Sequence, residues 1–82
     1  MTHPHPTLAQ LKPGERATIA SISTRCPIEE RRRLMELGFF PGIAVEATLS
    51  SPLGDPVAYV VREMTVALRR EQAELIEVER AS

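Results

Sequence analysis

The sequence predicts a mainly β fold with one α-helix, in the form of a small five-stranded β-barrel. With 82 residues the chain has room for a single small core. Five short segments have the composition or alternation of strands, whereas only one longer segment has helical spacing. Five short strands cannot form two packed sheets, but they can curl into a barrel that hides its own edges. We expect one domain over residues 8–82, preceded by a flexible tail over residues 1–7.

The first strand is predicted over residues 15–23, ERATIASIS, which is rich in β-branched and small side chains. Ala17 and Ile19 alternate as expected for a half-buried strand, but Ile22 is out of phase with them. A bulge near Ser21 restores the register, so we expect one there.

The helix is predicted over residues 27–38, PIEERRRLMELG. When its side chains are placed at about 100° per residue, four apolar ones fall on one side and four charged ones on the other. The side expected to be buried consists of Ile28, Leu34, Met35 and Leu37, and the solvent side consists of Glu29, Arg32, Arg33 and Glu36. Gly38 is expected to form a left-handed C-terminal cap, and Pro41 prevents continuation of the helix.

The remaining elements follow at short intervals. They are strands over 43–49, 57–61, 65–69 and 75–79, with a turn-rich break over 50–56 and a helical turn over 70–74. A tight turn at Glu63–Met64 is expected to join the third and fourth strands, without a glycine to ease it. In the last strand, Ile76 and Val78 are expected to face inward.

Composition excludes several classes of function. Ten basic and eleven acidic residues give a net charge of −1, which provides no general attraction to nucleic acid or to anionic lipid. A single cysteine permits no intrachain disulfide and fits a reducing compartment. The chain has no apolar run long enough to insert into a membrane and no secretory signal at its N-terminus. We therefore expect a cytoplasmic protein.

No catalytic constellation is evident, and we expect the protein not to be an enzyme. A Cys-His pair would have to join Cys26 to His5, which lies in a segment with nothing to hold it in place. No cofactor is required. His3 and His5, with Cys26 or a carboxylate, could bind a divalent metal such as zinc, most plausibly at a contact between molecules. The alternative function is therefore a metal-binding sensor or carrier that uses this tail.

The two phenylalanines are adjacent, directly before Pro41–Gly42. Because neighbouring extended residues point to opposite sides, a buried Phe39 leaves Phe40 at least partly exposed. Phe40 is therefore a candidate contact residue for a partner protein.

Three segments of the chain together resemble the FeoA family, ferrous iron transport protein A. They are LKPGERATIASI, RRRLMELGFFPGIAVEATLSSPLGDPVAYVV and TVALRREQAELIEVE, and the resemblance covers residues 8–79. The specific pieces are the helix end RLMELGFFPG, the turn PLGDP and the segment ALRREQAELIEV. The chain departs from the family pattern at Glu63–Met64, where family members often have a glycine.

The resemblance implies an SH3-like β-barrel, a cytosolic location, no enzymatic activity and a role in bacterial ferrous iron uptake. The partner it implies is FeoB, a membrane permease with a cytosolic GTP-binding domain, which the protein would bind and modulate. The expected contact residues are Phe40, chosen for its side-chain direction, and Leu53 and Gly54, chosen for the exposure of their turn. An unpaired barrel edge or the tail could support a weak homodimer. FeoA-like domains also occur in metal-dependent repressors, but this chain lacks the DNA-binding helix pair that such a role requires.

Overall fold

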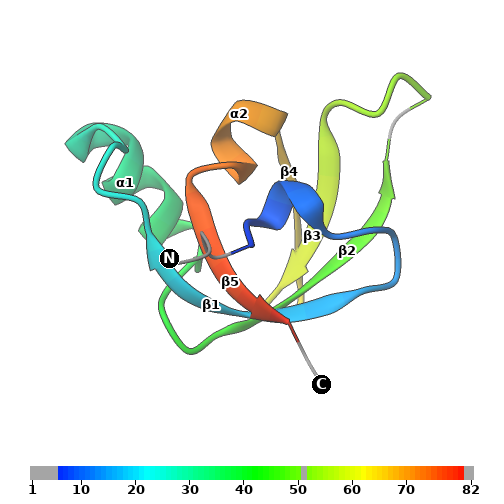
Figure 1. Cartoon of the computed structure of the whole chain (residues 1–82), viewed down its shortest axis with the longest axis horizontal. Coiled ribbons are helices and arrows are strands. Elements are labelled where there is room, and N and C mark those ends of the chain that lie inside the picture. Colours follow the sequence, from blue (N-terminus) through cyan, green and yellow to red (C-terminus); the bar gives the residue numbers. More distant parts are fainter. Residues whose placement is uncertain (1–5, 51, 81–82) are drawn as a thin grey trace, which may run out of the picture.

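The mainly β fold with one principal helix is confirmed by a computed structural model of the chain, which describes residues 6–50 and 52–80 (Figure 1). Its strands are β1 (Arg16–Ile22), β2 (Ala44–Ser50), β3 (Val57–Val61), β4 (Met64–Leu68) and β5 (Ile76–Arg80). Its helices are a 3₁₀ turn η1 (Leu8–Gln10), α1 (Ile28–Glu36) and the short α2 (Arg70–Ala73). The sequence did not predict η1. In the part of the chain that the structure describes, no helix combines the length and the apolar character needed to cross a membrane.

The five strands form one antiparallel sheet in the order β4-β3-β2-β1-β5. The predicted bulge in β1 is confirmed, because the register of β1 against β5 shifts between Ile19 and Ser21. The outer side of β5 is covered by residues that the sequence assigns to the tail. The Val78 N–H donates to the Pro6 carbonyl at 2.8 Å, and Thr7 pairs with Glu77.

The core lies on the concave side of this sheet and is closed by side chains from η1 and α1. It contains apolar side chains and Tyr59, and the described residues include no buried charged group. Its largest fully buried members are Tyr59, Phe39, Leu8, Ile19, Leu34, Leu68, Ile76, Val45, Val61 and Val78. The predicted inward orientation of Ile76 and Val78 is thus confirmed.

The turn between β3 and β4 lies one residue earlier than predicted. Val61 pairs with Met64, so the turn residues are Arg62 and Glu63, and Met64 begins β4. Arg62 has φ of 50° and Glu63 has φ of 70°. Two consecutive left-handed residues are typical of the two-residue turn whose twist matches that of the flanking strands. The sequence could not indicate this position, because neither residue is one that readily adopts positive φ.

The prediction that Ile28 is buried is wrong, since its side chain is 74% exposed. Leu34 is completely buried, whereas Met35 and Leu37 are partly buried against the core. Leu34 follows Ile28 by six residues, which places the two side chains about 120° apart around the helix. Because the helix turns Leu34 towards the sheet, Ile28 is directed away from it.

Candidate interaction surface

A shallow apolar groove runs along the outer face of α1. Ile28 and Met35 on the helix and Phe40 beyond its end provide the apolar surface, and the charged residues at its rim are Arg31, Arg32 and Glu36. Its volume is about 410 Å³. We refer to these six residues as the α1 groove.

The C-terminal end of α1 fixes how the two phenylalanines leave the helix. Gly38 has φ of 109°, its N–H donates to the Met35 carbonyl at 3.0 Å, and the Phe39 N–H donates to the Leu34 carbonyl at 3.1 Å. This pair of hydrogen bonds is the Schellman motif, which confirms the predicted left-handed cap. Leu34 and Phe39 are both completely buried, as the apolar contact of this motif requires.

Phe40 is held by a tight turn directly after this cap. The Ile43 N–H donates to the Phe40 carbonyl at 3.1 Å, and Gly42, with φ of 91°, occupies the position of the turn that favours glycine. The Gly42 N–H in turn donates to the Ile19 carbonyl of β1 at 2.8 Å. Phe40 is half-buried, as the alternation of the two phenylalanines predicts.

Polar contacts at both sides of α1 hold the helix in place. The Arg31 guanidinium donates to the carbonyls of Ile22 and Ser23, at 3.3 and 3.0 Å. On the side facing α2, the Gln72 amide donates to a Glu30 carboxylate oxygen at 3.0 Å. The α1 groove is therefore formed before any partner binds, which lowers the entropy cost of binding.

The other predicted contact residues lie elsewhere on the molecule. Leu53 is 93% exposed, and Gly54 beside it is also exposed, with φ of 81°. Figure 1 shows that the loop between β2 and β3, which carries both residues, and α1 lie at opposite ends of the molecule. The structure therefore does not bring Leu53 and Gly54 together with Phe40.

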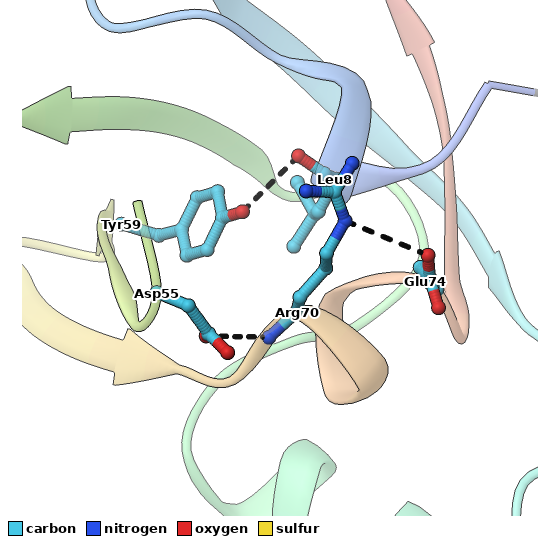
Figure 2. Close-up of polar contacts among 5 residues, drawn as sticks. All are labelled: Leu8, Asp55, Tyr59, Arg70 and Glu74. Carbon is cyan, nitrogen blue, oxygen red and sulfur yellow. Dashed lines mark hydrogen bonds and ion pairs between the residues drawn. The ribbon is translucent and has the colours of Figure 1, made fainter. Parts of the chain in front are cut away.

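The base of this loop is held by Asp55. Its carboxylate accepts a hydrogen bond from the Arg70 N–H at 2.9 Å, and the Arg70 side chain reaches Glu74 at 3.8 Å (Figure 2). Beside them, the Tyr59 hydroxyl donates to the Leu8 carbonyl at 3.1 Å. The loop thus extends from a fixed base, and the exposed large apolar side chain among its described residues is Leu53.

Cys26, the single thiol, is buried. Burial, with a smaller contribution from the Glu30 carboxylate, raises the pKa of this thiol, although Arg31 opposes the change. The reactive thiolate is disfavoured, so Cys26 is suited to packing rather than to catalysis. Residues 6–50 and 52–80 contain no cluster of three or more groups able to hold a metal ion. His3 and His5 lie outside the described residues.

A second hollow, of about 560 Å³, lies between α1 and α2. Its charged lining residues carry both signs and are Glu30, Arg33, Arg69 and Glu71. No nucleophile and base lie together there, and the signs of the charges favour no single class of ligand.

The sequence pattern indicated partial exposure for Phe40 but not for Ile28 and Met35, which share its surface. The sequence signal that could have found them is the angular position of each side chain around the helix. Ile28, Arg32 and Glu36 lie four residues apart and therefore follow one side of the helix, and Met35 falls about 20° from Ile28 on that side. Leu34 lies well outside this arc, so the four apolar residues do not form one buried stripe.

The sequence model of the FeoA domain matches residues 7–80. The chain belongs to the FeoA family. FeoA domains are non-catalytic accessory domains, which confirms that the chain is not an enzyme. The family is one of ferrous iron transport, as the resemblance implied.

Three relatives illustrate this similarity. A fusion of Fe(2+) transport protein A with the Fe(2+) transporter FeoB, from Porphyromonas gingivalis, is 39% identical over 72 residues. That match covers 88% of this chain but only 8% of the fusion protein. FeoA from Chlorobium tepidum has a TM-score of 0.86 at 35% identity, covering 94% of this chain and 71% of that one. FeoA from Stenotrophomonas maltophilia, a prokaryotic SH3 domain protein in complex with zinc, has a TM-score of 0.80 at 30% identity over 90% and 89% of the two chains. The SH3-like fold is thus confirmed.

Proposed function

We propose that this protein is a cytoplasmic accessory protein of ferrous iron uptake that acts by binding the cytosolic face of FeoB. The observation that carries this proposal is the Porphyromonas gingivalis relative, in which the corresponding domain and FeoB form one polypeptide. Fusion keeps two domains at high effective concentration, which is useful when a contact between separate chains would be weak. Binding would modulate GTP turnover or transport by FeoB, since FeoA domains are accessory domains rather than catalytic ones.

The α1 groove is the best candidate for the surface that contacts FeoB. It combines three apolar side chains on one preformed face with charged residues at its rim. An apolar centre with a polar rim is the usual anatomy of a protein–protein interface. Because the groove is small, we expect a contact of modest area and a transient complex.

The tip of the β2–β3 loop is a second, separate candidate. Leu53 projects almost fully into solvent, and its position at the opposite end of the molecule means that it would serve a different contact from Phe40. Comparison of the two sites therefore needs one substitution in each.

The test is a binding titration of the full chain against the soluble cytosolic part of its cognate FeoB. Phe40→Ser is expected to weaken binding, whereas Met64→Ser, which removes a half-exposed apolar side chain from β4, serves as the matched control. Leu53→Ser reports separately on the loop. Urea titrations of each variant show whether a loss of binding reflects a loss of folding.

Iron uptake in cells completes the test. With FeoB intact and protein levels matched, Phe40→Ser is expected to reduce uptake of ferrous iron, and Met64→Ser is expected to leave it unchanged. Full binding and uptake with Phe40→Ser would remove the α1 groove from the FeoB contact. Full uptake after deletion of the gene would contradict the accessory function itself.

A metal-binding role is the second candidate, because the relative from Stenotrophomonas maltophilia was crystallised with zinc. His3 and His5 are the residues of this chain that would provide imidazole ligands. Calorimetry with zinc and ferrous ions on the parent chain and on His3→Ala/His5→Ala tests this candidate. Equal heats for the two chains would exclude the histidine pair.

A further inference from the structure

The charge pattern along the α1 groove has an unusual symmetry. Ile28, Arg32, Glu36 and Phe40 follow one another at intervals of four residues, and all four line the groove. Their order is apolar, positive, negative, apolar. Arg32 and Glu36 are exposed, and neither forms an ion pair within residues 6–50 and 52–80. Both charges are therefore available to a partner.

This order is complementary to its own reverse. When a second α1 is laid antiparallel across the first, with the two-fold axis midway between residues 32 and 36, Arg32 of each copy faces Glu36 of the other. Phe40 lies beyond the end of the helix, after the cap at Gly38, so Ile28 of each copy lies at the end of the contact where the other copy carries Phe40. A two-fold contact uses the same patch on both copies, so it requires a patch with this property.

We propose that a second copy of this chain occupies the α1 groove, forming a two-fold symmetric dimer through antiparallel α1 helices. Met35 lies one residue from the axis, so the two Met35 side chains differ in level by only about 3 Å and contact each other at the centre. The centre of the interface is then apolar, with two reciprocal ion pairs beside it and the apolar residues Ile28 and Phe40 towards its two ends.

A second copy fits this face better than an unrelated acidic or basic segment. A segment of one charge would satisfy Arg32 or Glu36 and repel the other. An occupant must present a negative group opposite Arg32 and a positive group opposite Glu36, with the spacing of one helical turn and apolar groups on either side. This chain presents that arrangement on the α1 groove itself.

The dimer is expected to be weak. Stable dimers use about 20–30 residues on each side, and the α1 groove has six. Self-association would therefore appear at high concentration and exchange rapidly. If the proposed FeoB contact uses the same groove, the dimer and FeoB compete for it, so dimerisation would limit docking. That competition rests on the proposed function, whereas the dimer itself does not.

The experiment is sedimentation equilibrium of the full chain over a wide concentration range, with charge reversals in the α1 groove. Arg32→Glu or Glu36→Arg alone makes both facing pairs repulsive, and each is expected to weaken self-association by at least about tenfold. An equimolar mixture of these two variants pairs opposite charges again and is expected to associate. The double variant Arg32→Glu/Glu36→Arg is expected to associate with itself but not with the parent chain.

Two controls apply the same change of charge elsewhere. Lys12→Glu matches Arg32→Glu, and Glu79→Arg matches Glu36→Arg; all four residues are exposed. Both controls are expected to self-associate as the parent does. A parent chain that remains monomeric throughout would overturn the proposal. If the single charge reversals do not affect self-association, the dimer contact lies on another face, such as β4. That result would also overturn the proposal.

Recovery of association in the mixture tests the pairing of Arg32 with Glu36. The double variant distinguishes the dimer from FeoB docking. Failure of the mixture and of the double variant to associate would overturn the antiparallel pairing of Arg32 with Glu36. FeoB has no reason to accept the exchanged charges, so the double variant should recover self-association without recovering FeoB binding. If the parent chain does not bind FeoB, the proposed function is refuted, whereas the dimer proposal is unaffected.

Discussion

Replacement of Glu63 by glycine is expected to stabilise the domain. Glu63 occupies the second position of the β3–β4 turn with φ of 70°, a left-handed conformation that glutamate rarely adopts. In the described part of the chain, its side chain makes no hydrogen bond or ion pair that compensates for this conformation. Glycine adopts the same backbone conformation without steric cost.

The expected gain follows from two opposing contributions. Relief of the left-handed conformation contributes about 1–2 kcal/mol, while the extra freedom of glycine in the unfolded chain removes about 0.4–1 kcal/mol. The middles of the two ranges differ by about 0.8 kcal/mol, which is the net increase expected in the free energy of unfolding. For a domain of this size that increase corresponds to a rise in melting temperature of roughly 3–6 °C.

Urea titration and thermal unfolding of parent, Glu63→Gly and Glu63→Ala test this reasoning. The alanine variant removes the carboxylate but keeps Cβ at the same φ, so its stability should stay within about 0.5 kcal/mol of the parent. If glycine lowers the urea midpoint, or if alanine stabilises as much as glycine does, the left-handed conformation of Glu63 does not strain the turn.

Three further predictions concern the core and its pH dependence. Gly38→Val should lower the free energy of unfolding by about 1–2 kcal/mol, because Gly38 has φ of 109°, a backbone conformation that strains a residue with a Cβ; an unchanged urea midpoint would contradict this. Leu34→Ala should cost about 2–5 kcal/mol and Arg32→Ala less than about 0.5 kcal/mol, and urea titrations giving the reverse order would refute the orientation of α1. Burial raises the pKa of the Cys26 thiol above its ordinary value of 9.0 and that of the Tyr59 hydroxyl above 10.0, so the free energy of unfolding should fall above about pH 9, and more steeply above about pH 10, as the folded state resists both ionisations. Unfolding followed from pH 8 to 11 checks this, since Tyr59→Phe should reduce the decline above about pH 10 and leave the part that Cys26 contributes.

Much of the sheet was predictable because its signals are local. Alternation in β1 and β5 identified the inward residues, and the phase error at Ile22 identified the bulge. The glycine before Phe39 identified the end of α1. Each of these features depends on a few neighbouring residues whose preferences agree with the tertiary structure.

The η1 turn and the position of the β3–β4 turn could not be predicted in the same way. Leu8 is completely buried and its carbonyl accepts the Tyr59 hydroxyl, a contact between residues 51 positions apart that leaves no local pattern. Glu63 adopts its conformation because strand pairing on either side requires it, against its own preference. Tertiary contacts decided both elements.

The candidate site was only partly predictable, for a different physical reason. An apolar side chain on a helix is favourable against a core and also against a partner, so Ile28 and Met35 give the same pattern in both settings. The orientation of α1 about its own axis decides which apolar side chains face the core and which face outward. That orientation is fixed by the cap at Gly38 and the burial of Phe39. Phe40 was identified because its neighbour is so clearly a core residue.

The packing of α1 explains how this small domain can keep an apolar surface. Of the nine residues of α1, only Leu34 is fully buried, so the helix contributes little of the core that holds the sheet together. Its outer face is then free to change without loss of the fold, since exposed substitutions there cost little stability. The Arg31 and Glu30 contacts nevertheless hold the helix in a fixed orientation. A rigid helix with an outer face that the core does not need is suited to binding another protein, and this combination favours an adaptor role for the domain over a catalytic one.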